Sequence, residues 1–372
     1  MALQDEIELK AKQIHTDGYS LSIGELMSLY RDREIDIHPE FQRFFRWSPN
    51  QKTKLIESIL LGIPIPPIFV SQREDGVWDV IDGLQRLSTI LEFSGLLRDS
   101  EGNIKAASKL NGTDYLPSLE GKYWQKDDDL PNSFDQTQRL IIKRSKLGVQ
   151  IIKKESDKDT KFELFQRLNT GGTALTEQEI RNCILVMINK DFYTWLSELS
   201  QSPNFQSVLP ISDRAVEEQY DVELALRYFV YKSITLEEVN STKDIGKLLT
   251  DKMVEFASDE NFDYEGEKAN FDKVFELLNS ALGEDAFRKW EPQKNKFTGA
   301  FSISLFEVIV TGFGKNSELY NNTAESQAEL AEKIKSISLN QVFIDNSGNG
   351  KRASTRLPHF LPLGTQIFGN EN

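Results

Sequence analysis

Residues 82–86, Asp-Gly-Leu-Gln-Arg, combine a flexible backbone position with side chains suited to phosphate chemistry. Gly83 lets the main chain approach a ligand closely, and the free N–H groups of the helix that starts here favour an anion. Arg86, in the first helical turn, can clamp a phosphate with two hydrogen bonds. Asp82 could hold Mg²⁺ directly or through water, and Gln85 could orient a water or read a base edge. An ordinary helix start with solvated side chains is the structural alternative, because Asp-Gly pairs are common in turns.

A second motif, Pro-Glu-Phe-Gln-Arg at residues 39–43, is followed by an aromatic run that ends at Trp47. Arg43 and Arg46 place positive charge beside these aromatic side chains. Such a pattern could bind a phosphate or stack on a base. Packing of aromatic residues in a core or at its rim explains the same pattern and is the more common case.

A third motif, Asn-Thr-Gly-Gly at residues 169–172, precedes a helix whose start is predicted by the Thr176–Glu179 capping box. The motif resembles a phosphate-cradling loop, but it lacks the Lys-Ser/Thr pair of a Walker A sequence. A sharp structural turn is an equal alternative. Cys183 falls on the apolar face of the following helix, so we expect a buried structural thiol.

The elements around these motifs alternate between strand and helix. A capping box of Ser48 and Gln51 predicts a helix that ends at Gly62. Glu74-Asp75-Gly76 predicts the turn of a hairpin that leads directly into the first motif. Further predicted elements are a helix over 20–30, a strand following it, a polar insertion over 99–135, a strand over 147–154, and a helix ending at the third motif.

The second half of the sequence is dominated by helical spacing. Phe271, Phe275, Leu278 and Leu282 recur at helical intervals, and Gly283 is placed to end that helix. The run at residues 345–358 reads as part of a flexible basic tail. We therefore predict an α+β protein: a small mixed-sheet domain at 1–188, followed by an α-helical domain at 189–372.

Composition narrows the class of protein. The 372 residues, 39 % of them hydrophobic, can build packed cores. A net charge of −14 disfavours broad coating of DNA, although a local basic groove stays open. One cysteine fits a reducing compartment, and the 3 histidines supply neither a Cys/His zinc site nor an HNH nuclease motif. No run approaches the roughly 18 apolar residues of a membrane span, so we expect a cytoplasmic protein without a membrane partner.

The motifs also occur in an informative order. P-x-x-Q-R-x-x-x-W (39–47) is followed by G-x-P-x-P-P (62–67), by D-G-x-Q-R-L-x-T (82–89) and by F-x-R-L-N-x-G-G with a later E-x-R-N (165–182). This order resembles the N-terminal domain family of GmrSD-type restriction endonucleases, over roughly residues 20–235. The resemblance implies a ParB/sulfiredoxin-like fold for the first domain.

In that family the Asp-Gly-Gln-Gln-Arg box is linked to nucleotide binding and hydrolysis, and members serve in defence against modified or foreign DNA. The resemblance implies a nucleoside triphosphate as ligand, with Mg²⁺, bound by residues matching the motifs: Asp82, Gly83, Gln85 and Arg86, Gln42 and Arg43, and Asn169 and Gly171. Arg86 and Arg43 would bind phosphate. Asp82 would hold the metal or position water, and Gln85 would position water or the base. Leu84 departs from the family's first glutamine, which puts hydrolysis in question.

Many family members carry a C-terminal His-Me-finger nuclease domain, and this sequence has no matching histidine motif. We therefore expect an NTP-binding defence protein that acts with a separate nuclease or toxin, and NTP hydrolysis stays open. Any contact with DNA would use a local basic groove or that partner. Two other functions stay open: a regulatory or antitoxin-like binding protein without catalysis, and a ParB-like metal-dependent nuclease, which the acidic pI disfavours.

Overall fold

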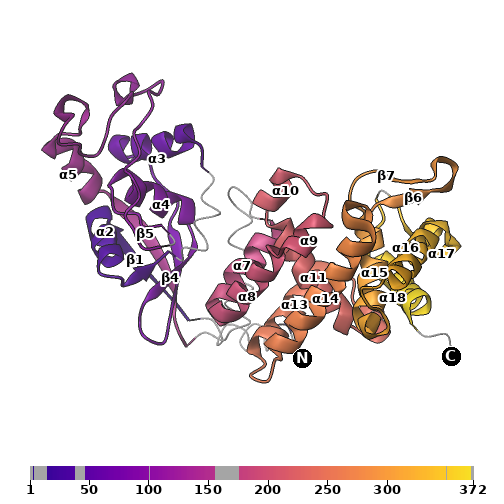
Figure 1. The fold of residues 1–372 in the computed structure, drawn as a ribbon. Helices are drawn as coiled ribbons and strands as arrows, with labels where there is room; N and C mark the ends of the chain where they lie inside the picture. Colours follow the sequence, from indigo (N-terminus) through magenta and orange to yellow (C-terminus); the bar gives the residue numbers. More distant parts are fainter. Residues whose placement is uncertain are drawn as a thin grey trace. The chain divides into compact units, whose positions relative to one another are not determined.

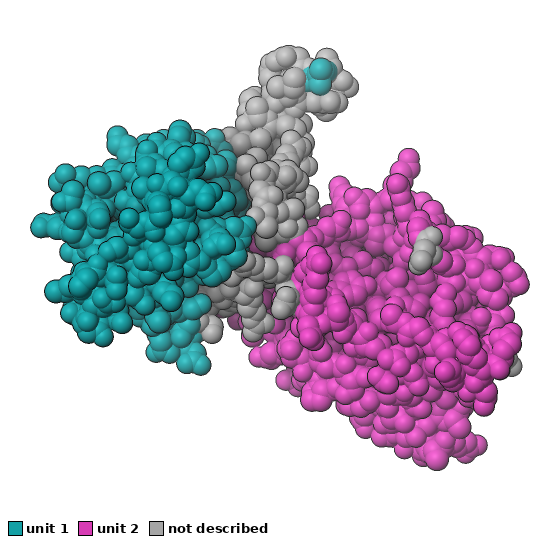
Figure 2. Space-filling view, turned by 90° about the horizontal axis from the view of Figure 1, so that it is seen from above, with its two compact units in different colours: residues 1–175 teal, residues 176–372 magenta. Residues whose placement is uncertain are grey.

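The computed structural model describes Leu3 and residues 15–37, 47–99, 101–155, 176–348 and 350–369. Its contacts divide the chain into two compact units, residues 1–175 and 176–372 (Figures 1 and 2). We predicted a boundary after residue 188. Helix α7 (Glu177–Ile188) accounts for the difference, because it packs against three helices of the second unit: α8 (Lys190–Ser200), α11 (Tyr220–Ser233) and α13 (Ile245–Ser258).

The first unit is built on one mixed five-stranded sheet, as predicted. The strand order is β1-β5-β3-β4-β2; β1 and β5 pair antiparallel, as do β3 and β4, whereas β3–β5 and β2–β4 are parallel. The hairpin expected around residues 74–76 is the β3–β4 pair. The strands are β1 (Thr16–Ser22), β2 (Ile35–Asp36), β3 (Ile68–Gln72), β4 (Trp78–Asp82) and β5 (Lys146–Ile152).

Four α-helices of this unit are described: α2 (Ile23–Arg31), α3 (Pro49–Leu61), α4 (Leu84–Phe93) and α5 (Gln136–Arg144). The predicted start and end of α3 are confirmed. Ser48 and Gln51 form the capping box, and Gly62 ends the helix with a φ of 69°. Part of the segment expected as a helix over 20–30 is instead β1, which α2 follows directly.

The polar segment over 99–135 contributes to the core of the first unit despite its irregular backbone. It contains two short 3₁₀ turns, Pro117–Leu119 and Leu130–Asn132. Trp124 and Phe134 are buried, and their rings pack edge-on against Phe93 of α4 with centroids 5.8 and 5.2 Å apart. These aromatic contacts anchor the segment to the core.

The second unit is helical, apart from one two-stranded hairpin formed by β6 (Lys289–Glu291) and β7 (Lys296–Thr298). The α+β class predicted from the sequence is confirmed. No described helix has the length and apolar character needed to cross a bilayer. Besides α7, the helices are α8 (Lys190–Ser200), α9 (Pro203–Ser207), α10 (Asp213–Glu217), α11 (Tyr220–Ser233), α12 (Leu236–Ser241), α13 (Ile245–Ser258), α14 (Tyr264–Leu282), α15 (Ile303–Asn316), α16 (Ala324–Leu339), α17 (Gln341–Asn346) and α18 (Ala353–Phe368).

The expectation of a flexible basic tail is wrong for the residues that form α18. This helix packs tightly on α15, where Gly312 and Gly364 bring the two backbones together. Arg356, which we placed in the tail, is buried and donates to both carboxylate oxygens of Glu307, at 2.8 and 2.7 Å. This buried ion pair and the glycine contact tie the end of the chain to the helical core.

Candidate functional site

The junction between β4 and α4 brings the residues of the first motif together. Asp82 is the last residue of β4, and Gly83 occupies the N-cap position of α4 with φ 89° and ψ 13°. No side chain caps the start of this helix, whereas a serine caps the start of α2 and full capping boxes are present at the starts of α3, α5 and α7. The first turn of α4 therefore presents backbone N–H groups without a side-chain acceptor, as an anion site requires.

The guanidinium of Arg86 lies across the start of the same helix. Its Nη2 donates to Asp82 Oδ2 at 3.0 Å and to the carbonyl oxygen of Pro67 at 3.1 Å. The side chain is only 16 % exposed, and its buried Nε has no hydrogen-bond acceptor among the described residues. A buried charged donor without a partner is costly, so Arg86 is positioned to accept a further anionic partner.

Gly83 is required by its neighbours as well as by its backbone angle. A Cβ at this position would lie 2.3 Å from Ile68 Cγ2, 2.9 Å from Ile68 Cβ and 3.0 Å from Arg86 Nη2. Ile68 is fully buried at the start of β3. The side of Gly83 that lacks a side chain thus faces the core and Arg86.

Gln85 connects the junction to the segment that carries the second motif. Its Oε1 accepts a hydrogen bond from the backbone N–H of Trp47 at 3.3 Å. Its carbonyl oxygen accepts from Thr89 Oγ1 at 2.7 Å. The amide oxygen of Gln85 is therefore already engaged, and this contact holds Trp47 next to α4.

Four predicted site residues, Gln42, Arg43, Asn169 and Gly171, lie outside the described residues. Their assignment to the site stays a prediction from the motifs. The described residue that follows the second motif is Trp47, at the contact with Gln85.

The predicted role of Asp82 as a metal ligand also stays a prediction. One of its carboxylate oxygens is hydrogen-bonded to Arg86. Within the described ranges, no group of three or more His, Cys, Asp or Glu side chains could hold a metal ion. A lone carboxylate suits Mg²⁺ that is bound mainly through phosphate oxygens and water, rather than in a protein cage.

The E-x-R-N segment at residues 179–182, which follows the third motif in the sequence, belongs to a buried polar network in the second unit. Arg181 is 2 % exposed, and it donates to Gln178 Oε1 at 2.8 Å and to Glu223 Oε2 at 2.7 Å. Asn182 is fully buried and accepts from Gln178 Nε2 at 2.8 Å. Cys183 is buried as expected, and burial raises the pKa of its thiol well above the ordinary value. These residues act within the helical core.

The comparisons with known proteins assign the motif-bearing part of the chain. Residues 23–186 match the family model described as the GmrSD restriction endonuclease, N-terminal domain. The family resemblance expected from the motif order is thereby confirmed. Searches of curated proteins and of solved structures found no match.

The match to the GmrSD N-terminal domain covers less than half of the 372 residues. It includes strands β2 to β5 of the sheet and the 82–86 junction. It also extends past residue 175 into α7 of the second unit. The family's sequence pattern therefore includes both the candidate ligand site and part of the helical core.

Proposed function

We propose that residues 82–86 bind the phosphates of a nucleoside triphosphate, and that this protein is a nucleotide-binding component of a restriction or anti-phage system. The family match supports the second part of the proposal. The first part rests on one observation: Arg86, whose buried Nε lacks an acceptor among the described residues, lies at the uncapped start of α4.

The electrostatics of the junction favour a bound anion. The N-terminus of a helix carries a partial positive charge, and the guanidinium adds a full one. Asp82 offsets part of this charge through its ion pair with Arg86. A polyanionic ligand with Mg²⁺ fits this arrangement. Asp82 would hold the metal, and the metal would neutralise part of the phosphate charge.

The other residues take supporting roles in this proposal. Asp82 holds the metal or positions the attacking water, and Gln85 orients the water or the base. Gln42, Arg43, Asn169 and Gly171 complete the nucleotide site. The protein acts with a separate effector, a nuclease or toxin, and the nucleotide controls that interaction.

The binding half of the proposal is tested by Arg86→Ala, assayed by calorimetry against a panel of nucleoside triphosphates with and without Mg²⁺. Loss of a charged donor should weaken binding by about 1.5–3 kcal/mol. Arg144→Ala is the matched control, because Arg144 is exposed in the last turn of α5. Arg86→Lys separates charge from geometry, since lysine retains the charge without the planar fork.

Equal affinity in wild type and in folded Arg86→Ala protein would show that this guanidinium does not bind phosphate. Phosphate release measured on the wild type and on Asp82→Asn then separates hydrolysis from binding alone. Hydrolysis that disappears in Asp82→Asn, with binding retained, would assign the catalytic role to Asp82.

A further inference from the structure

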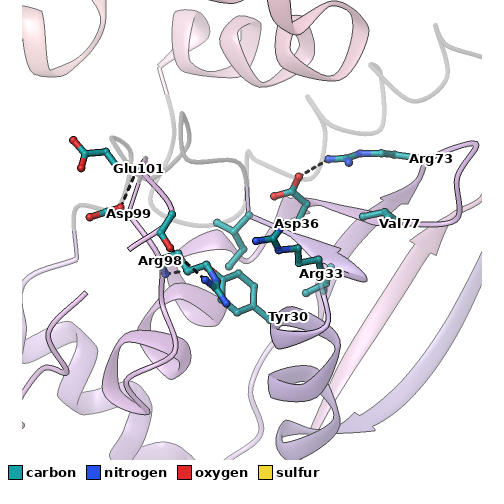
Figure 3. Close-up of a pocket in the computed structure, with 11 residues that line it drawn as sticks. Tyr30, Arg33, Asp36, Arg73, Val77, Arg98, Asp99 and Glu101 are labelled. Carbon is teal, nitrogen blue, oxygen red and sulfur yellow. Dashed lines mark hydrogen bonds and ion pairs between the residues drawn. The ribbon is translucent and has the colours of Figure 1, made fainter. Parts of the chain in front are cut away.

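The first unit contains a cavity of about 490 Å³ that none of the three sequence motifs predicts. It lies between the C-terminal end of α2, strand β2, the β3–β4 turn and the loop that follows α4 (Figure 3). Its volume falls within the range typical of small-molecule sites. Three arginines line it, namely Arg33, Arg73 and Arg98.

Arg33 adopts a backbone conformation that normally favours glycine. Its φ is 63°, and it follows the C-cap residue of α2. The Arg33 N–H donates to Tyr30 O at 3.3 Å and the Glu34 N–H donates to Leu29 O at 2.8 Å, which is the Schellman pattern. A non-glycine residue carries a conformational cost there. This cost is unexplained by packing, since Arg33 is exposed and makes no ion pair with any described residue.

Tyr30 supplies a second, independent polar group to the cavity. Its side chain is only 7 % exposed, and its hydroxyl oxygen accepts a hydrogen bond from the backbone N–H of Arg98 at 3.1 Å. The hydroxyl hydrogen has no acceptor among the described residues. Burial raises the pKa of Tyr30, so the hydroxyl stays protonated and can donate. Figure 3 shows Tyr30 and the Arg98 side chain together at the base of the cavity.

The acidic residues of the cavity are largely occupied by other partners. Arg73 bridges Asp36 and Asp79, with hydrogen bonds of 2.6 Å to Asp36 and 2.8 Å to Asp79. Asp99 accepts two backbone N–H groups of its own turn at 2.9 Å. Figure 3 shows the carboxyl groups of Asp99 and Glu101 on the side of the cavity away from Arg33. A ligand between Arg33 and Tyr30 would therefore face donors.

We propose that this cavity binds the phosphate group of a small phosphate monoester, with Arg33, Arg98 and the Tyr30 hydroxyl as its donors. Arg98 already donates through Nη1 to the carbonyl oxygen of Gly102 at 3.3 Å. Its other N–H groups, the Arg33 guanidinium and the neutral Tyr30 hydroxyl match the oxygens of a dianion. The unfavourable backbone of Arg33 is retained because it places a guanidinium at the cavity. This site is additional to the nucleotide site proposed at residues 82–86, and it does not depend on it.

The test replaces Arg33 by glycine in the full chain. Glycine suits a φ of 63°, so Arg33→Gly should fold with wild-type stability or better. Calorimetric titration with inorganic phosphate and with phenyl phosphate should show about tenfold weaker binding or worse, the effect of losing one charged donor. Arg31→Ala is the matched control, because Arg31 is exposed in the last turn of α2 and does not line the cavity.

Arg31→Ala should bind each probe as tightly as the wild type does. Arg33→Lys should bind with intermediate affinity because it keeps the charge alone. Tighter binding of phenyl phosphate than of inorganic phosphate would identify an ester as the ligand. Binding of free phosphate alone would overturn the monoester assignment. Unchanged affinity in Arg33→Gly, or no binding to the wild type, would overturn the site itself.

Discussion

Gly83→Ala is expected to destabilise the first unit by more than its backbone angle alone requires. The φ of 89° places residue 83 in the left-handed region, which costs an alanine about 1–2 kcal/mol. In addition, the new Cβ would lie 2.3 Å from Ile68 Cγ2. Ile68 is fully buried, so β3 and β4 must shift to accept it. Overpacking of this kind costs about 1–3 kcal/mol, which brings the expected total to roughly 3 kcal/mol.

Gly76 provides a matched control for the backbone term. Its φ is 88°, yet a Cβ there would meet nothing within 4 Å. Gly76→Ala should therefore cost only the first contribution, about 1–2 kcal/mol. Urea-induced unfolding of the full-length variants, with hydrogen exchange at the β3 and β4 amides to isolate the first unit, measures both changes.

A double-mutant cycle with Ile68→Ala isolates the steric contribution. Removing Cγ2 should make Gly83→Ala less costly by about 1–2 kcal/mol than in the wild-type background. If Gly83→Ala costs no more than Gly76→Ala, and the cycle shows no coupling to Ile68, the steric argument is wrong.

The same geometry affects Gly83→Asn, because any Cβ at this position meets Ile68. Loss of nucleotide binding in a Gly83 variant would therefore not distinguish ligand contact from packing, whereas Arg86 variants can.

Two further predictions concern the second unit. Gly312→Ala should destabilise the second unit by about 3 kcal/mol in urea-induced unfolding. The new Cβ would lie 2.1 Å from the backbone oxygen of Gly364, which cannot rotate away. Wild-type stability in this variant would mean that α15 and α18 do not pack this closely. Lys252 and the Thr235 N–H lower the pKa of Glu238 from 4.5 to about 2, so its stabilising contribution is complete above pH 4.5 and is lost as the pH falls towards 2. The stability difference between wild type and Glu238→Gln should shrink over that interval, and a constant difference would contradict the assignment.

Local signals in the sequence were sufficient for the elements that are fixed by their own residues. The Ser48–Gln51 and Thr176–Glu179 boxes predicted the starts of α3 and α7, because a capping box satisfies helix N–H groups within four residues. Helix α5 has the same signal at Asp135 and Gln138, and it was missed inside a polar stretch.

Elements that depend on distant partners were not predictable in this way. Strand β1 is mostly polar and has no buried residue, and it exists because its register with β5 pairs it along its full length. Helix α18 contains Pro358 and Pro362, which argue against a helix locally. Its formation depends on contacts with α15, including the Glu307–Arg356 pair, which lies 49 residues apart in sequence.

The same distinction between local and distant signals applies to the two proposed sites. The 82–86 junction follows from a strand, a glycine and a helix that are adjacent in sequence. The cavity at Arg33 does not, because its lining comes from four separate segments. The only local signal is an arginine where a helix usually ends in glycine, and this signal appears once the end of α2 is known.

Arg227 and Arg356 of the helical unit are paired differently from Arg86 and Arg33 of the first unit. In the helical unit, Arg227 donates twice to Glu223 Oε1 and once to Tyr231, and Arg356 is bidentate to Glu307. Such arrangements satisfy the planar fork of the side chain and leave little to offer a ligand. Breaking one of these pairs would leave a buried charge, which destabilises the fold.

Arg86 and Arg33 of the first unit differ from this pattern in a consistent way. Arg86 is largely buried, but its Nε has no acceptor among the described residues. Arg33 adopts an unfavourable backbone angle and makes no ion pair with any described residue. A fold under selection for stability alone would replace the first by an apolar side chain and the second by glycine. Both substitutions would remove a positive charge from a site that is proposed to bind an anion. The ligand sites proposed at Arg86 and Arg33 would explain both features, whereas the ion pairs of Arg227 and Arg356 belong to the packing of the helical unit.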